Sequence, residues 1–346
     1  MADASPPQMT ADEKFMREAI KLARRGAGQT RPNPAVGCVL VKNGRIIARG
    51  YHRRAGQPHA EIETLRTLKN PDRARGATAY VTLEPCSTHG RTPPCTEALA
   101  RAGLARVVVG AIDPNPRHRG RGLACLARAG IETVSGLLAD QCAALNPEFH
   151  HFMLTGMPWV VAKCGMSLDG RLTRPPGEGQ WITSAAARAD AMKLRARVGA
   201  ILVGAGTIRA DDPALTVRGI KSVEQPRRIV WAPRSQPAAK AQVFTDHYRQ
   251  QTIVLRQSSL RAALRALGRQ GIQSVLVEGG GHTLGQLFSS HLANEVVFYL
   301  GPMIAGGSVP AVAEAKLTPP CTLICSRVIR LGSCLRLSGL VKTNRT

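Results

Sequence analysis

Four residues in the first third of the chain have side chains that can bind a metal ion or move a proton: His59, Glu61, Cys86 and Cys95. The two cysteines lie in the stretch EPCSTHGRTPPC, each directly after a proline, with eight residues between them. Such a pair could form a disulfide, bind a metal or be two unrelated core thiols. One histidine nitrogen and two thiolates leave a tetrahedral zinc ion with an open position for water, which is typical of a catalytic site.

Glu61 stands two residues after His59, at the predicted start of a helix, so both side chains can face one pocket. Zinc lowers the pKa of its water toward about 7, and Glu61 could then shuttle protons. Zinc deaminases of nucleobases have the signature HxE followed by PCxxC. The HxE and the PC are present here, but the second cysteine is displaced to the longer gap. We interpret the pattern as a zinc deaminase site, against the alternative of a surface histidine and two core thiols.

Strands and helices alternate around these residues. Apolar spacing predicts helices at 12–26, 60–68 and 96–103, and apolar runs predict strands at 77–83 and 106–112. Asn43-Gly44 indicates a hairpin over 36–52. Cys86 would follow a strand end, while Cys95 would open a helix whose positive end favours a thiolate. The pattern predicts a three-layer α/β domain.

A domain boundary is expected around residues 147–158, where two prolines and a glycine interrupt the alternation. The second half then has predicted strands at 159–165, 200–206, 227–232, 252–255, 295–302 and near 335–341. Helices are predicted near 184–197 and 259–271. SVLVEGGGHTLGQLF (274–288) reads as strand, glycine cluster and helix, whose N-terminus could hold a phosphate, although alone this signal is weak.

Composition limits the classes of protein. The 346 residues suggest two domains. The N-terminus lacks a secretory pattern and no run of 18 apolar residues occurs, so we expect a cytoplasmic protein without a membrane partner. The net charge is +24, but no block of five basic residues appears and only 4% of residues are aromatic. These features disfavour nucleic acid as a partner.

The motifs PNPAVGCVLV, GYHRRAGQPHAE, TLEPCSTHGRTPPC, DPNP, KCGMSLDGR, QWIT, DDPALTVR and VEGGGHTLG follow one another along nearly the whole chain. In this order they closely resemble the bifunctional riboflavin-biosynthesis deaminase/reductase family. The resemblance implies a cytidine-deaminase-like α/β/α domain at 1–150 and a dihydrofolate-reductase-like α/β domain at 158–346.

The resemblance also implies the chemistry. Zinc-dependent hydrolysis would deaminate 2,5-diamino-6-(5-phosphoribosylamino)pyrimidin-4(3H)-one, with Glu61 as proton carrier and His59, Cys86 and Cys95 as ligands. NADPH would then reduce the ribosyl group of 5-amino-6-(5-phosphoribosylamino)uracil to ribityl. The implied partners are these small phosphorylated pyrimidines and further copies of the chain in a homo-oligomer.

Binding residues are carried over by the same resemblance. The deaminase substrate would be contacted by Asn33, His52, Arg91, Asp113 and Asn115. NADPH would be contacted by Gly165, Trp181, Thr207, Asp211, Gly280, Gly281, His282, Thr283, Leu284, Gly285 and Gln286. The reductase substrate would be contacted by Gly179, Arg195, Leu215, Arg218 and Glu278.

Two departures from the family pattern affect these assignments. Thr88 stands where many relatives have histidine, and His89 could partly replace it. Gly179 stands where a serine is usual, a loss of one hydrogen bond worth about 1 kcal/mol. Two alternatives stay open: a deaminase whose reductase-like domain serves only assembly, and an RNA-editing or nucleic-acid-binding deaminase. The long cysteine gap disfavours the second.

Overall fold

The computed structural model describes residues 9–89, 93–174, 177, 181–220, 224–314 and 317–342. The chain divides into two compact units, Met1–Thr155 and Gly156–Thr346. Two of the residues predicted to bind substrate, Arg91 and Gly179, lie outside the described residues.

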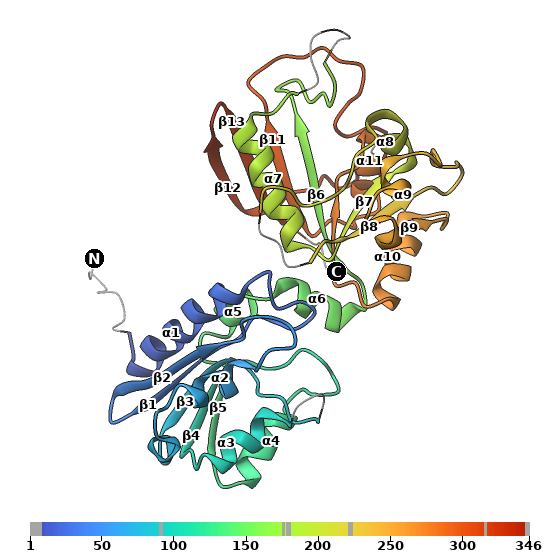
Figure 1. Cartoon of the computed structure of the whole chain (residues 1–346). Coiled ribbons are helices and arrows are strands. Elements are labelled where there is room, and N and C mark those ends of the chain that lie inside the picture. Colours follow the sequence, from blue (N-terminus) through green and yellow to red (C-terminus); the bar gives the residue numbers. More distant parts are fainter. Residues whose placement is uncertain are drawn as a thin grey trace, which may run out of the picture. The chain divides into compact units, whose positions relative to one another are not determined.

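The first unit is built on a five-stranded sheet of order β2-β1-β3-β4-β5 (Figure 1). Its strands are β1 (Gly37–Lys42), β2 (Arg45–Tyr51), β3 (Thr78–Leu83), β4 (Arg106–Ala111) and β5 (Glu132–Ser135). β1 runs antiparallel to β2 and β3, whereas β3, β4 and β5 are parallel. Its helices are α1 (Ala11–Gly26), α2 (Ala60–Arg66), η1 (Pro71–Ala74), α3 (Cys95–Arg101), α4 (Arg121–Arg128), α5 (Ala139–Ala143) and α6 (Pro147–Thr155).

Alternating side chains of the strands supply a core on each face of this sheet. Leu40 of β1 packs in one cluster with Leu99 of α3 and Leu126 of α4. Its neighbour Val39 packs in the other cluster, together with Met16 of α1. Because successive strand side chains point to opposite faces, one apolar strand serves both helix layers. The predicted three-layer arrangement is confirmed.

Helix α2 is fixed tightly against β2. A Cβ atom at Gly50 would lie 2.6 Å from the backbone nitrogen of Thr64, so only glycine allows this approach. The Thr64 hydroxyl is 2.6 Å from the carbonyl oxygen of Ala60 and 3.2 Å from that of Cys38. These contacts set the position of the N-terminal end of α2, which has His59 as its N-cap and Glu61 in its first turn.

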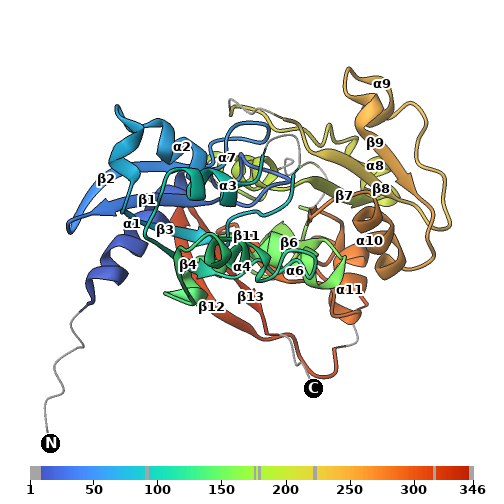
Figure 2. The same ribbon diagram turned by 90° about the horizontal axis from the view of Figure 1, so that it is seen from below.

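The second unit contains an eight-stranded sheet of order β12-β13-β11-β6-β10-β7-β8-β9. Its strands are β6 (Trp159–Met166), β7 (Ala200–Gly204), β8 (Arg227–Trp231), β9 (Thr252–Leu255), β10 (Ser274–Val277), β11 (Glu295–Leu300), β12 (Leu323–Leu331) and β13 (Cys334–Val341). Six strands from β11 to β9 are parallel, and β13 and β12 extend the sheet antiparallel at one edge (Figure 2).

Helices cover both faces of this second sheet. They are α7 (Ala185–Arg197), α8 (Ala205–Asp211), α9 (Gln242–Thr245), η2 (Arg249–Gln251), α10 (Leu260–Arg269) and α11 (Gly281–Ser289). Leu264 of α10 and Leu287 of α11 pack in one core cluster, and Leu194 of α7 and Ile208 of α8 in another. Both units are therefore α/β layers with their own cores.

Two elements differ from expectation. The segment around 147–158, expected to break the pattern, forms helix α6, because a proline is well tolerated in the first turn of a helix. Strand β12 was not predicted, because nearly all of its residues are exposed and it has no buried face to give an alternating pattern. Within the described residues, no helix combines the length and apolarity needed to cross a membrane.

Candidate active sites

The residues His59, Glu61, Cys86 and Cys95 come together at the carboxyl end of β3. His59 is the N-cap of α2, Cys86 follows β3 and Cys95 opens α3. The Nδ1 atom of His59 lies 3.6 Å from the Sγ atom of Cys86 and 3.4 Å from that of Cys95. Tetrahedral ligands bound about 2.0–2.3 Å from a zinc ion lie about 3.5 Å apart, so the donor set and its spacing fit zinc.

The cysteines are free thiols and not a disulfide. Hydrogen bonds from Cys95 and His59 lower the pKa of Cys86 far below its ordinary value, while hydrogen bonding to Cys86 raises the pKa of Cys95. The backbone N–H of Cys95 also donates to the sulfur of Cys86 at 3.3 Å. The thiolate form of Cys86 is therefore favoured, and a thiolate can bind a cation.

Glu61 faces the same place from the first turn of α2. Its side chain is buried, and burial followed by the negative charge of Cys86 raises its pKa to about 7. A carboxyl group that titrates near neutral pH can both take up and release a proton. The geometry thus places a group able to carry a proton beside the three residues that could bind a metal ion.

A pocket of about 220 Å³ opens onto this cluster. Four of the five residues predicted to bind the deaminase substrate line it: Asn33, His52, Asp113 and Asn115. The Nδ1 atom of His52 is 3.0 Å from the carbonyl oxygen of Pro58, so Nδ1 carries the proton and Nε2 accepts from the Asn33 amide at 3.3 Å. Burial lowers the pKa of His52, which keeps the ring neutral.

Thr88 lines this pocket, but His89 does not. The His89 side chain is 70% exposed and lies 3.5 Å from the carboxylate of Glu97. The prediction that His89 could stand in for the histidine missing at position 88 therefore has no support in the geometry.

Several residues that line this pocket were not predicted from the sequence. Phe149 and Met153 of α6 give the pocket an apolar wall, and His118 also lines it. Glu84, directly before the Pro85-Cys86 pair, accepts the backbone N–H groups of Asp113, Gly120, Gly122 and Leu123 at 2.9–3.3 Å. Its place at the end of a buried strand, next to a metal ligand, is the signal that could have identified it.

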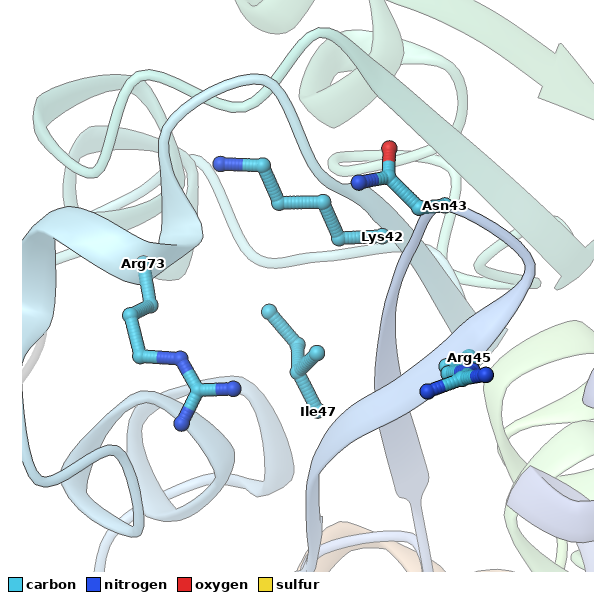
Figure 3. A pocket seen from close by; sticks show the side chains of 5 residues that line it. All are labelled: Lys42, Asn43, Arg45, Ile47 and Arg73. Carbon is cyan, nitrogen blue, oxygen red and sulfur yellow. The ribbon is translucent and has the colours of Figure 1, made fainter.

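A further hollow in the first unit lies at the β1–β2 turn, remote from the carboxyl end of β3. It is lined by Lys42, Asn43, Arg45, Ile47 and Arg73 (Figure 3). The cations do not converge: Arg45 and Arg73 lie on opposite sides of Ile47, and the ammonium of Lys42 donates to the carbonyl of Arg75 at 2.8 Å. These described lining residues include neither a carboxylate nor a thiol, so we place no catalysis there.

The second unit has a larger pocket of about 670 Å³. The predicted residues that line it are Gly165, Trp181, Thr207, Asp211, Gly280, Arg195, Leu215, Arg218 and Glu278. Trp181 is 55% exposed and stacks on the Arg188 guanidinium, 4.6 Å from the ring centre. Core packing is therefore not the role of this tryptophan.

The rest of the predicted glycine-rich segment does not line this pocket. Gly281, His282, Thr283, Leu284, Gly285 and Gln286 form the first turns of α11. Leu284 is fully buried in the core, and His282 contacts Gln286 and Glu314 instead. Of this segment, Gly280 is the residue at the pocket, where its N–H donates to the Thr207 hydroxyl at 3.3 Å.

An ionic cluster lies at the carboxyl end of β10. The two carboxylate oxygens of Glu278 accept hydrogen bonds from the Arg195 guanidinium at 2.9 and 2.8 Å. The Nζ atom of Lys163, on β6, lies 3.7 Å from the same carboxylate. Burial alone would raise the pKa of Glu278, but Lys163 and Arg195 hold it at about 2. Glu278 is therefore ionised. Lys163 was not predicted from the sequence, although it stands in the KCGMSLDGR motif.

Comparison with known proteins connects both sites to one family. The family model described as the cytidine and deoxycytidylate deaminase zinc-binding region matches residues 9–111, and that of the RibD C-terminal domain matches 158–335. The riboflavin biosynthesis protein RibD of Escherichia coli (strain K12) is 43% identical over 331 residues, covering 85% of this chain and 89% of that protein. RibD of Bacillus amyloliquefaciens is 40% identical over 322 residues, covering 86% of each.

Solved structures agree with these matches. RibD of Acinetobacter baumannii has a TM-score of 0.87 at 38% identity, covering 96% of this chain and 99% of that one. A diaminohydroxyphosphoribosylaminopyrimidine deaminase/5-amino-6-(5-phosphoribosylamino)uracil reductase of Thermotoga maritima has a TM-score of 0.85 at 32% identity, with the same coverage. The predicted fold class is confirmed. The chain belongs to the RibD family and is a bifunctional deaminase and reductase of riboflavin biosynthesis.

Proposed function

We propose that the domain at 1–150 deaminates 2,5-diamino-6-(5-phosphoribosylamino)pyrimidin-4(3H)-one and that the domain at 158–346 reduces the ribosyl group of the product to ribityl. The observation that carries the proposal is the cluster of His59, Cys86 and Cys95, with Glu61 lining the same pocket as His59 and Cys86. Self-association and a cytoplasmic location stay predictions from the sequence.

For the deaminase we propose zinc as the cofactor, bound by His59, Cys86 and Cys95. The ion would supply activation of a water molecule for attack on the ring carbon that bears the amine. Glu61 would carry a proton to the ring nitrogen and then to the departing ammonia. Its burial and its raised pKa support this assignment.

The other side chains that line the deaminase pocket suit a flat polar ring. Phe149 and Met153 offer apolar contact to its faces. The Asn33 amide donates one N–H to His52, which leaves its carbonyl oxygen available to the substrate. Asp113 and Asn115 would accept from hydroxyls or amines of the substrate.

For the reductase we propose NADPH, which would supply the hydride that opens the ribose. Gly165, Trp181, Thr207, Asp211 and Gly280 would contact the cofactor. Because it is ionised, Glu278 can accept hydrogen bonds from ribose hydroxyls, and Lys163 can donate to the ring oxygen or hydroxyls as the bond opens. Arg218 lies exposed at the same pocket and suits a phosphate.

A coupled assay with the diaminopyrimidinone ribotide, zinc and NADPH tests both halves. We expect ammonia to be released first and NADPH to be oxidised only once the deaminated intermediate has formed. Ammonia release without NADPH oxidation, including after addition of that intermediate, would contradict the reductase assignment. No ammonia from a zinc-loaded protein would contradict the deaminase assignment.

A further inference from the structure

Asn146 is a buried side chain that stands directly before helix α6. Its amide pairs with both backbone polar groups of Ala35, which is far away in the sequence. The N–H of Ala35 donates to the Oδ1 atom of Asn146 at 2.6 Å, and the Nδ2 atom of Asn146 donates to the carbonyl oxygen of Ala35 at 2.9 Å. The side chain therefore closes a ring of two hydrogen bonds with one residue, as a neighbouring antiparallel strand would.

The surroundings of Ala35 make this pairing valuable. Ala35 is buried, and a buried N–H or carbonyl group is costly to leave without a partner. An asparagine amide has one acceptor oxygen and one donor nitrogen, so it satisfies both groups at once. An aliphatic side chain at position 146 would satisfy neither, and a carboxylate would satisfy the N–H alone.

The segment around Ala35 belongs to the wall of the deaminase pocket, which is lined by Asn33, Pro34 and Val36. The carbonyl oxygen of Val36 accepts the N–H of His52 at 2.9 Å. The Asn33 amide lies 3.3 Å from the Nε2 atom of His52. The amide of Asn146 is thus connected, through residues 33–36, to two of the predicted substrate contacts.

On its other side, Asn146 is tied to helix α6. Its carbonyl oxygen accepts the N–H of His150 at 3.0 Å, within the first turn. Phe149 and Met153 are four residues apart on this helix, so they share one face, and both line the pocket. Asn146 is not among the lining residues. One buried amide therefore joins two segments that form the pocket, from behind them.

We propose that Asn146 is a positioning residue of the deaminase: its amide holds residues 33–36 against the start of α6, so that Asn33 and Phe149 meet the substrate in a fixed arrangement. Groups that are already in place lose less entropy when the substrate binds. This inference rests on the proposed deaminase function. It adds a residue that acts on substrate binding through its neighbours, without touching the substrate.

The first test is Asn146→Ala. We expect KM for the diaminopyrimidinone ribotide to rise about tenfold, with kcat changed less than about twofold and zinc content unchanged. The amide hydrogen of Ala35 should also exchange faster with deuterium, a readout by mass spectrometry that needs no turnover. Asn70→Ala is the control in the same unit, because Asn70 accepts the N–H of Asp72 at 2.9 Å and does not line the pocket. It should leave both readouts unchanged.

The second test is Asn146→Asp, whose effect should depend on pH in a way that lost stability alone would not produce. The ionised carboxylate turns an oxygen toward the Ala35 carbonyl, whereas the protonated form can donate to that carbonyl. Burial raises the pKa of a carboxyl group, so the ratio of KM for Asn146→Asp to KM for wild type should fall from about pH 8 to about pH 6. Taking the ratio removes the titration of Glu61, which both proteins share.

A folded Asn146→Ala protein with wild-type KM, or a KM ratio for Asn146→Asp that does not change with pH, would overturn the proposal. Zinc content reports folding of the first unit, and if Asn146→Ala fails this check, the KM ratio for Asn146→Asp decides. A wild-type protein that releases no ammonia would instead count against the deaminase function itself. The exchange rate of the Ala35 amide would then decide whether Asn146 holds this segment.

Discussion

At the scale of single residues, the proposed role of Glu61 connects burial to proton transfer. A buried carboxylate is costly unless it exchanges protons or is paired. Glu61 is buried, and Cys86, His59 and Cys95 all act on its charge. Its raised pKa follows from burial and from the negative charge on Cys86. The spacing of His59 and Glu61 allowed the proposed role to be predicted from sequence, because His59 is the N-cap of α2 and Glu61 lies in its first turn.

We expect Glu61→Gln to lower the deamination rate at least about 100-fold, because the amide keeps the shape but cannot carry a proton. Zinc content should stay near one per chain by elemental analysis, since Glu61 is not a proposed ligand. Glu63→Gln is the control on the same helix, where Glu63 pairs with Arg53 at 3.0 Å. Substantial ammonia release by Glu61→Gln would refute the proton-carrier role.

Glu278 shows the opposite case, a buried carboxylate that stays charged. We expect Glu278→Gln to destabilise the protein by about 3 kcal/mol at neutral pH, because Arg195 and Lys163 then lack their counter-charge. Its pKa is lowered from 4.5 to about 2. The stabilisation is therefore complete above about pH 4.5 and is lost as pH falls through about 2.

Urea unfolding of wild type and Glu278→Gln at pH 7 and about pH 3.5 measures this difference. The difference in the free energy of unfolding between wild type and Glu278→Gln should be smaller at the lower pH. Glu295→Gln removes a more exposed pair with Arg197 and should cost under about 1 kcal/mol. A larger difference in the free energy of unfolding at the lower pH would contradict the assignment of Glu278 as ionised.

At the scale of elements, one carboxylate holds the loop between β4 and α4. Glu84→Gln keeps one acceptor oxygen but turns an NH₂ group toward backbone N–H donors, which should cost about 1–3 kcal/mol. We expect KM for the deaminase substrate to rise several-fold, with zinc content and reductase rate unchanged. Glu132→Gln, on the exposed edge strand β5, should have no effect on KM. An unchanged KM for Glu84→Gln would show that the loop does not depend on this anchor.

The elements also show where sequence reasoning succeeds and where it stops. Strands β3 and β4 were predictable because burial on both faces makes them continuously apolar. The pocket wall formed by Phe149 and Met153 was not, because the prolines around α6 suggested a boundary. His118 was missed for a different reason: a lone histidine among arginines gives no periodic signal, and only the fold brings it to the pocket.

For the molecule as a whole, each of the two units contains its own candidate site. The pocket with the metal ligands draws all its described lining residues from the first unit, and the pocket with Glu278 draws its own from the second. Zinc removal should therefore separate the two activities. After dialysis against a chelator we expect ammonia release to be lost, while NADPH oxidation with added 5-amino-6-(5-phosphoribosylamino)uracil keeps its rate.

Re-addition of zinc should restore ammonia release, which distinguishes metal loss from damage to the thiols of Cys86 and Cys95. Zinc-loaded Glu61→Gln should behave like the metal-free enzyme in both assays, because it loses the same step for a different reason. If the chelator also abolished NADPH oxidation, with the second unit still folded by circular dichroism, the reductase would depend on the metal. Independence of the two sites would then be wrong, even though no metal-ligand cluster occurs among the described residues of the second unit.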